Sequence, residues 1–190
     1  MKNTKYFVRS YATNLVGTAY GDTVSFTTAG LDTIYITSFN TDPADWVKYS
    51  AAGNNWTWDA TNQVMVANGY GGTAASSCYL ISPAIDLSGT SGSVLTFESW
   101  TKYTDSGLAT PVEVMISQNY SGNGSPSSAT WTLLSCVLPG ANSFVWTSSG
   151  NVDLSSYHGN VYIMFHYSSS GTGSADASKW EVDTFKVVGY

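Results

Sequence analysis

A chain of 190 residues is long enough for one full domain with its own hydrophobic core and part of a second domain. Its net charge of −6 and its single arginine, Arg9, exclude a surface that neutralises a run of phosphates, so we expect no nucleic-acid binding. Aromatic residues make up 14% of the chain and charged residues only 11%. Together with abundant Gly, Ser, Thr and Asn, this composition favours short strands joined by polar turns.

The sequence also predicts no insertion into a membrane. No apolar stretch approaches the ~20 residues that a membrane-spanning helix needs. The first residues, Met1-Lys-Asn-Thr-Lys, lack the apolar segment of a signal peptide. We therefore expect any export signal to lie upstream of this chain or to have been removed.

Residues 5–28 predict a β-hairpin. Tyr6, Val8, Ser10 and Ala12 alternate onto one face, a turn follows at 14–17, and a second alternating run ends at 24–28. Residues 1–29 resemble the last two strands of a fibronectin type III domain. A lone two-stranded ribbon is marginally stable in water, so we expect the face of Tyr6, Val8 and Ala12 to pack on the rest of the chain or on a second molecule.

Residues 30–190 predict an all-β domain, a two-layer antiparallel β-sandwich or jelly roll. Short alternating runs are separated by Gly- and Ser-rich breakers, and no helix signal of convincing length is present. The expected strands are Thr33–Phe39, Gln63–Ala67, Cys78–Ser82, Val94–Trp100, Val112–Ser117, Thr130–Val137, Phe144–Thr147, Val161–Tyr167 and Trp180–Val188.

The two cysteines, Cys78 and Cys136, leave two alternatives open. They can form one disulfide or remain two separate buried thiols. A core of this size does not need a covalent staple, which favours the separate thiols.

Five segments in order carry a family resemblance. They are 79–87, 95–97, 112–117, 152–166 and 180–187. Together they resemble the cleaved-adhesin and choice-of-anchor J family of bacterial surface proteins, which is also similar to MAM domains. The resemblance implies a jelly-roll module, often stabilised by calcium, in a larger extracellular or cell-surface bacterial protein. It implies a binding or accessory role toward a glycan, a surface protein or neighbouring domains, and it supplies no catalytic residues.

The last expected strand suggests a metal site. If Phe185 and Val187 face the core, a period of two turns Asp183 and Glu181 to the same side. An inward carboxylate is costly unless an ion or several hydrogen bonds compensate it.

The resemblance implies that Asp183 lies near a structural calcium. Calcium takes several oxygen ligands, and the expected co-ligands are Glu98 and either Asn40 or Asp42. Thr184 and Asn40 stand where acidic residues are frequent in the family, which weakens the predicted site. The alternative is that Asp183 only accepts backbone hydrogen bonds.

Five aromatic residues are candidates for ligand binding. They are Trp56, Trp58, Tyr70, Trp100 and Tyr103, which stand among amide and hydroxyl side chains. An aromatic face can cover the apolar side of a pyranose ring while neighbouring polar groups bond its hydroxyls. The alternative for the first two is that they close the edge of the core.

Enzyme chemistry finds little support. Glu98 and Glu113 lie on strands that can be neighbours, which makes a glycosidase pair conceivable, but Glu113 alternates with apolar residues like an ordinary solvent-facing position. Neither His158 nor His166 stands in a nucleophile or metal motif. We therefore predict a non-catalytic carbohydrate-binding or adhesin-like module, with a glycoside hydrolase fragment and a passive spacer as alternatives.

Overall fold

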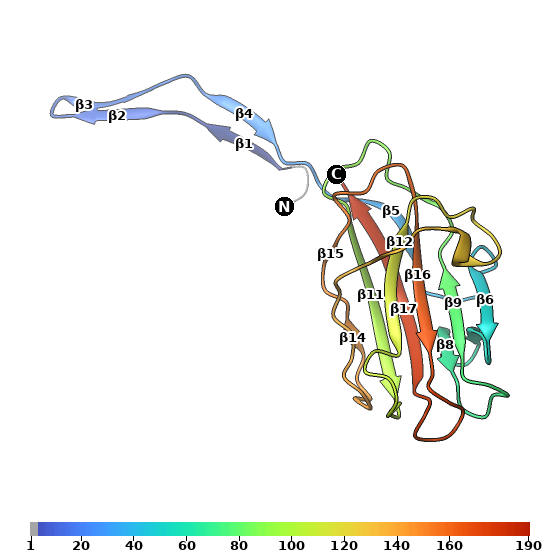
Figure 1. Cartoon of the computed structure of the whole chain (residues 1–190). Coiled ribbons are helices and arrows are strands. Elements are labelled where there is room, and N and C mark those ends of the chain that lie inside the picture. Colours follow the sequence, from blue (N-terminus) through green and yellow to red (C-terminus); the bar gives the residue numbers. More distant parts are fainter. Residues whose placement is uncertain (1–3) are drawn as a thin grey trace. The chain divides into compact units, whose positions relative to one another are not determined.

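The computed structural model describes residues 4–190, which fall into two compact units (Figure 1). One unit ends at Asp32 and also includes Tyr190, and the other is Thr33–Gly189. Residues 4–190 contain no α-helix, and accordingly no helix that is long and apolar enough to cross a membrane. The only helical element in this part of the chain is a single 3-10 turn, η1 (Pro126–Ser128).

The N-terminal unit is the predicted hairpin. It is formed by β1 (Lys5–Val8), β2 (Tyr11–Asn14), β3 (Gly17–Tyr20) and β4 (Val24–Thr27), with β1 paired to β4 and β2 to β3. The turn forms because the Asn14 side chain accepts the backbone N–H of Val16 at 2.9 Å.

The hairpin by itself does not bury its apolar face. Every residue of its four strands is exposed, including Tyr6, Val8 and Ala12. Its apolar side chains pack on one another instead, as in the stacked rings of Tyr6 and Phe26, whose centroids are 5.5 Å apart. Packing of this face on the rest of the chain or on a second molecule stays a prediction.

The larger unit is an antiparallel β-sandwich, as predicted (Figure 1). A six-stranded sheet has the order β13-β12-β16-β9-β6, with β10 beside β16. A seven-stranded sheet has the order β14-β11-β17-β8-β7, with β15 beside β11 and β5 beside β17. The strands are β5 (Asp32–Thr37), β6 (Val47–Ala52), β7 (Thr57–Asp59), β8 (Val64–Asn68), β9 (Ser77–Ile81), β10 (Ile85–Asp86), β11 (Val94–Lys102), β12 (Val112–Ser117), β13 (Thr132–Leu133), β14 (Thr147–Ser148), β15 (Val152–Asp153), β16 (Asn160–Ser168) and β17 (Lys179–Gly189).

The core lies between the two sheets because the long strands alternate strictly. In β11, Leu95 and Phe97 are buried while their neighbours are partly exposed. Phe97 meets Phe165 of the other sheet edge to face, with ring centroids 5.0 Å apart. Burial of such a side chain is worth about 1.5–3 kcal/mol, so this interface accounts for much of the stability of the sandwich.

A β-bulge in β17 reverses the strand parity that we expected. Glu98 pairs with Asp183 and Thr96 with Lys186, so one residue of β11 stands opposite two residues of β17, Thr184 and Phe185. Thr184 has a φ of 51° and is exposed. Residues before the bulge therefore have the opposite parity to those after it. The prediction that Asp183 shares the inward side of Phe185 is wrong, and Asp183 lies on the outer face of the seven-stranded sheet.

Two expected strands are much shorter in the structure. Only Thr132–Leu133 of the segment 130–137 forms a ladder, and 144–147 contributes only its last residue, to β14. Side chains along 132–138 still alternate, with Leu134 buried and Leu138 packed against the core. The alternation reflects an extended segment lying on the core, which needs few ladder hydrogen bonds. The sequence pattern missed β6, β7, β10 and β15, of which all but β6 are three residues or shorter.

The cysteines are separate thiols, which agrees with the alternative that we favoured. Cys78 is buried and Cys136 is partly buried. Burial raises the pKa of Cys78 to about 12, so this thiol stays protonated and inert at neutral pH.

Candidate functional site

Three of the five predicted ligand-binding side chains line one open pocket, which we call the Trp100 pocket. Its volume is about 570 Å³, within the ~300–1,000 Å³ range typical of small-molecule sites. A neighbouring cavity that shares Tyr103 has only about 100 Å³, too little for a sugar ring with its hydroxyls. The Trp100 pocket is lined by Asn68, Tyr70, Trp100, Lys102, Tyr103, Ser174, Ala177 and Lys179.

The base of the pocket is the outer face of the seven-stranded sheet. Lys102 of β11 stands opposite Lys179 of β17, which stands opposite Asn68 of β8. Trp100 lies two residues before Lys102 and therefore on the same face. Three adjacent strands thus place an indole ring, two ammonium groups and an amide side by side.

Two loops supply the exposed aromatic side chains. Tyr70 follows β8 in a turn closed by Asn68, whose side chain accepts the Tyr70 N–H at 3.0 Å. Tyr103 follows β11 with a φ of 67°, and its N–H donates to the Asn142 side chain at 3.0 Å. Their exposed fractions are 59% and 47%, so both rings offer a free surface.

A further aromatic group beside the pocket was not predicted from the sequence. Phe144 contacts Trp100 edge to face, with ring centroids 6.0 Å apart, and is itself half exposed. Its segment was expected to be a strand, and its N–H instead donates to the Thr101 carbonyl at 3.2 Å. The sequence signal was the run Phe144-Val145-Trp146 in a Ser-rich segment, which is unusual for a solvent-exposed loop.

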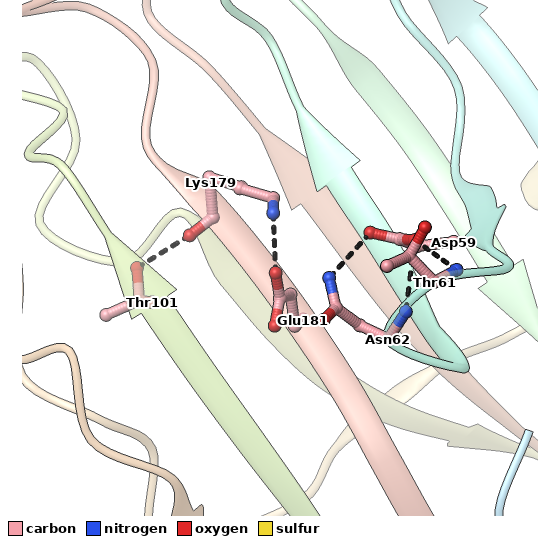
Figure 2. Close-up of polar contacts among 6 residues, drawn as sticks. All are labelled: Asp59, Thr61, Asn62, Thr101, Lys179 and Glu181. Carbon is pink, nitrogen blue, oxygen red and sulfur yellow. Dashed lines mark hydrogen bonds and ion pairs between the residues drawn. The ribbon is translucent and has the colours of Figure 1, made fainter.

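The lysines of the pocket differ in their partners. Lys179 donates to Glu181 at 2.5 Å, and the Thr101 hydroxyl donates to the Lys179 carbonyl at 3.0 Å (Figure 2). Lys102 instead lies over aromatic rings, 4.9 Å from the centroid of Tyr103 and 5.5 Å from that of Phe144. Within residues 4–190, Lys102 has no carboxylate in ion-pair range.

Asp59 ends β7 close to this polar group (Figure 2). Hydrogen bonds from the Asn62 side chain and from the backbone of Thr61 and Asn62 lower its pKa, with a smaller contribution from the charge of Lys179. Asp59 is therefore ionised at neutral pH, but its oxygens are occupied by its own turn.

The other two aromatic candidates belong to the core or its edge, which corrects the ligand-binding prediction. Trp56 is 2% exposed and packs edge to face on Phe165 and Tyr167. Trp58 packs against the core, and its indole N–H donates to the Phe39 carbonyl at 2.7 Å. Trp56 is too deeply buried to cover a sugar, so the core alternative holds for it, whereas Trp58 is partly exposed and lies outside the Trp100 pocket.

The residues predicted to hold calcium do not form a common donor set. Glu98 and Asp183 are cross-strand partners on the outer face of the sheet, and Asp183 accepts the Thr184 N–H at 2.6 Å. Asp42 is hydrogen-bonded to Lys48, and Asn40 is exposed. No group of three or more His, Cys, Asp or Glu side chains between residues 4 and 190 is placed to hold a metal. Calcium binding stays a prediction that rests on the resemblance.

The conceivable glycosidase pair is not assembled. Glu98 is on β11 of the seven-stranded sheet and Glu113 is on β12 of the six-stranded sheet. Both alternate with buried residues, so they point away from the core on opposite faces of the sandwich. Two carboxylates so placed cannot flank one glycosidic bond.

The outer face of the six-stranded sheet carries a second, shallower surface. His166 stacks on Tyr79 with centroids 4.4 Å apart, and Tyr49, Met115 and Trp131 complete a hollow of about 310 Å³. His166 Nδ1 is 3.4 Å from Glu113, and Nε2 is 3.2 Å from the hydroxyls of both Ser77 and Ser168.

The contact of two serine hydroxyls with His166 was not predicted from the sequence. Burial lowers the pKa of His166, while Glu113 partly offsets the effect. The group resembles a nucleophile and its base, but Ser77 lies within β9, which is paired on both sides by β6 and β16. Successive N–H groups of a strand point to opposite sides within the sheet, so those beside Ser77 do not converge on one point as an oxyanion hole requires.

The chain matches no protein-family model and no curated protein. Among solved structures it is similar to the K3 cleaved adhesin domain of Lys-gingipain from Porphyromonas gingivalis W83, with 16% identity and a TM-score of 0.51 over 82% of this chain and 99% of that one. The K1 cleaved adhesin domain of the same protein has 21% identity and a TM-score of 0.49 over 80% of this chain and 96% of that one. A carbohydrate-binding module of the β-sandwich superfamily has 12% identity and a TM-score of 0.43 over 98% of this chain and 74% of that one. At these identities, the likeness to the K3 domain concerns the fold, which agrees with the β-sandwich that the resemblance implied.

Proposed function

We propose that residues 33–189 are a non-catalytic carbohydrate-binding module of an extracellular or cell-surface protein, and that the Trp100 pocket is its binding site. The observation that carries the proposal is the convergence of Tyr70, Trp100 and Tyr103 from separate elements onto one pocket. The amide of Asn68 and the hydroxyl of Ser174 stand among these rings. Such a combination suits a pyranose, which has an apolar face and a polar rim.

The same reasoning makes the second surface a weaker candidate. Its carboxylate, Glu113, is engaged by His166, and the indole N–H of Trp131 donates to the Pro126 carbonyl at 2.9 Å. Fewer groups there are free to bond a sugar hydroxyl. A variant of this surface therefore serves as a control for the Trp100 pocket.

The test is a glycan array followed by titration calorimetry of the best ligand, with Trp100→Ala, Tyr103→Ala and Tyr49→Ala beside the wild-type chain. We expect either pocket variant to weaken binding at least about tenfold, or about 1.4 kcal/mol, because each removes an aromatic face. Tyr49→Ala should bind like the wild type. Folding of each variant is checked by its thermal unfolding.

Other outcomes would overturn the proposal. Binding that is lost in Tyr49→Ala but kept in Trp100→Ala would move the site to the six-stranded sheet. A folded protein that binds no glycan on the array would refute carbohydrate binding. A passive spacer or a module that binds a protein partner would then be the favoured alternatives.

A further inference from the structure

The Trp100 pocket is chemically unlike the rest of the sandwich surface. Residues 33–189 contain eleven carboxylate side chains and only four cationic ones, which are Lys48, Lys102, Lys179 and Lys186. Two of these four lysines line the Trp100 pocket, and no Asp or Glu lines it. On a strongly acidic domain, the aromatic pocket is therefore the place where positive charge collects.

Lys102 is the lysine of the Trp100 pocket that is available to a ligand. It carries no ion pair with any carboxylate among residues 4–190, whereas Lys48 is bound to Asp42 and Lys179 to Glu181. The rings of Tyr103 and Phe144 hold its ammonium group near the pocket without neutralising it. A cation held over aromatic faces keeps its charge for an anion that arrives from solvent.

Lys179 places a second ammonium group beside Trp100. Its ammonium lies 5.8 Å from the Trp100 ring centroid and directly across the sheet from Lys102. Glu181, which pairs with Lys179 and offsets its charge, is 7% exposed and does not line the pocket.

We infer that the Trp100 pocket selects an acidic sugar, with the pyranose ring on Trp100 and its carboxylate or sulfate group at Lys102. This inference rests on the proposed function and narrows its ligand class. A sugar ring on Trp100 would bring its acidic group close to Lys102, because Lys102 follows Trp100 by two residues and points to the same side of β11. A hydrogen bond from the Lys102 ammonium to a carboxylate or sulfate is stronger than one to a neutral hydroxyl, because both partners are then charged.

The experiment uses matched sugars that differ only in charge. An array presents neutral oligosaccharides of several linkages, each beside its C6-oxidised form, which carries a carboxylate, and its C6-sulfated form. The proteins are the wild type, Lys102→Gln and Lys186→Gln. Lys186→Gln is the matched control because it removes the same charge from β17 without touching the pocket.

We expect the acidic forms to bind at least about fivefold more tightly than their neutral parents at low salt, and we expect the difference to shrink as salt is raised. Lys102→Gln should remove most of this preference and leave neutral binding within about twofold of the wild type. Lys186→Gln should keep the preference. The oxidised and sulfated arms show which anion the pocket prefers.

The failures of the two proposals can be told apart. Neutral and acidic forms that bind equally well and depend on Trp100 would overturn the acidic preference and leave the glycan-binding function standing. A preference for acids that is unchanged in Lys102→Gln would place the anion elsewhere and also overturn the inference. A chain that binds no sugar of either kind would overturn the function itself.

Discussion

The β-bulge at Thr184 can be tested by replacing that residue with glycine. Thr184 is β-branched and has a φ of 51°, a left-handed conformation that costs an L-residue roughly 1–2 kcal/mol. Glycine adopts this φ freely, but its unfolded chain has more conformational entropy, which costs about 0.4–1 kcal/mol. The side chain of Thr184 is exposed, so little packing is lost. We therefore expect Thr184→Gly to stabilise the sandwich by about 0.5–1 kcal/mol.

The assay is urea unfolding followed by fluorescence, with an unchanged m-value as the sign that only stability has changed. The matched control is Thr96→Gly, because Thr96 lies in β11 next to the residue opposite the bulge and pairs regularly with Lys186. Glycine there should destabilise the strand by roughly 1 kcal/mol. If Thr184→Gly destabilises the protein as much as Thr96→Gly does, Thr184 is in ordinary strand geometry, and the assignment of Asp183 to the outer face is wrong.

Trp56→Ala should lower the free energy of unfolding by about 3–5 kcal/mol, because the ring is 2% exposed in the core; a loss below about 1 kcal/mol in urea unfolding would contradict this burial. The folded-state pKa of His166 is lowered by burial, so its contribution to stability is present above the unfolded pKa of about 6.5 and is lost as the pH falls toward the folded value. The free energy of unfolding should therefore drop more between about pH 7.5 and pH 5.5 in the wild type than in His166→Gln, and equal drops would refute the shift. The chain should hydrolyse neither polysaccharides nor simple esters, and turnover that disappears in Glu113→Gln would show catalysis at the second surface. If calcium binds, the midpoint of thermal unfolding should be higher in millimolar calcium than in EDTA, and Asp183→Asn should abolish this difference. Identical midpoints for the wild type would refute the calcium prediction.

Strands whose side chains alternate over their full length could be predicted from the amino-acid pattern. β12 begins and ends at the residues expected for it, and β9, β16 and β17 are each within one residue of the expected bounds at either end. The hairpin was equally legible, because its turn depends on Asn14 and its neighbours alone. A period of two and a local turn are short-range properties, and a single sequence records them directly.

Which candidate residues lie close together depends on long-range strand pairing, which the amino-acid pattern does not show. The bulge at Thr184 adds one residue to β17, so the side chains before and after it alternate out of phase. No propensity of threonine predicts its positive φ. The meeting of Lys102 with Lys179 depends on the pairing of β11 with β17 and on its register, which is set by the burial of both strands together. The exposure of Tyr70 and the burial of Trp56 could not be predicted either. Both residues lie in polar segments, and such a segment does not show whether its aromatic ring is exposed or buried. The sequence therefore identified candidate residues by their chemistry, and long-range strand pairing brought three of them into one pocket.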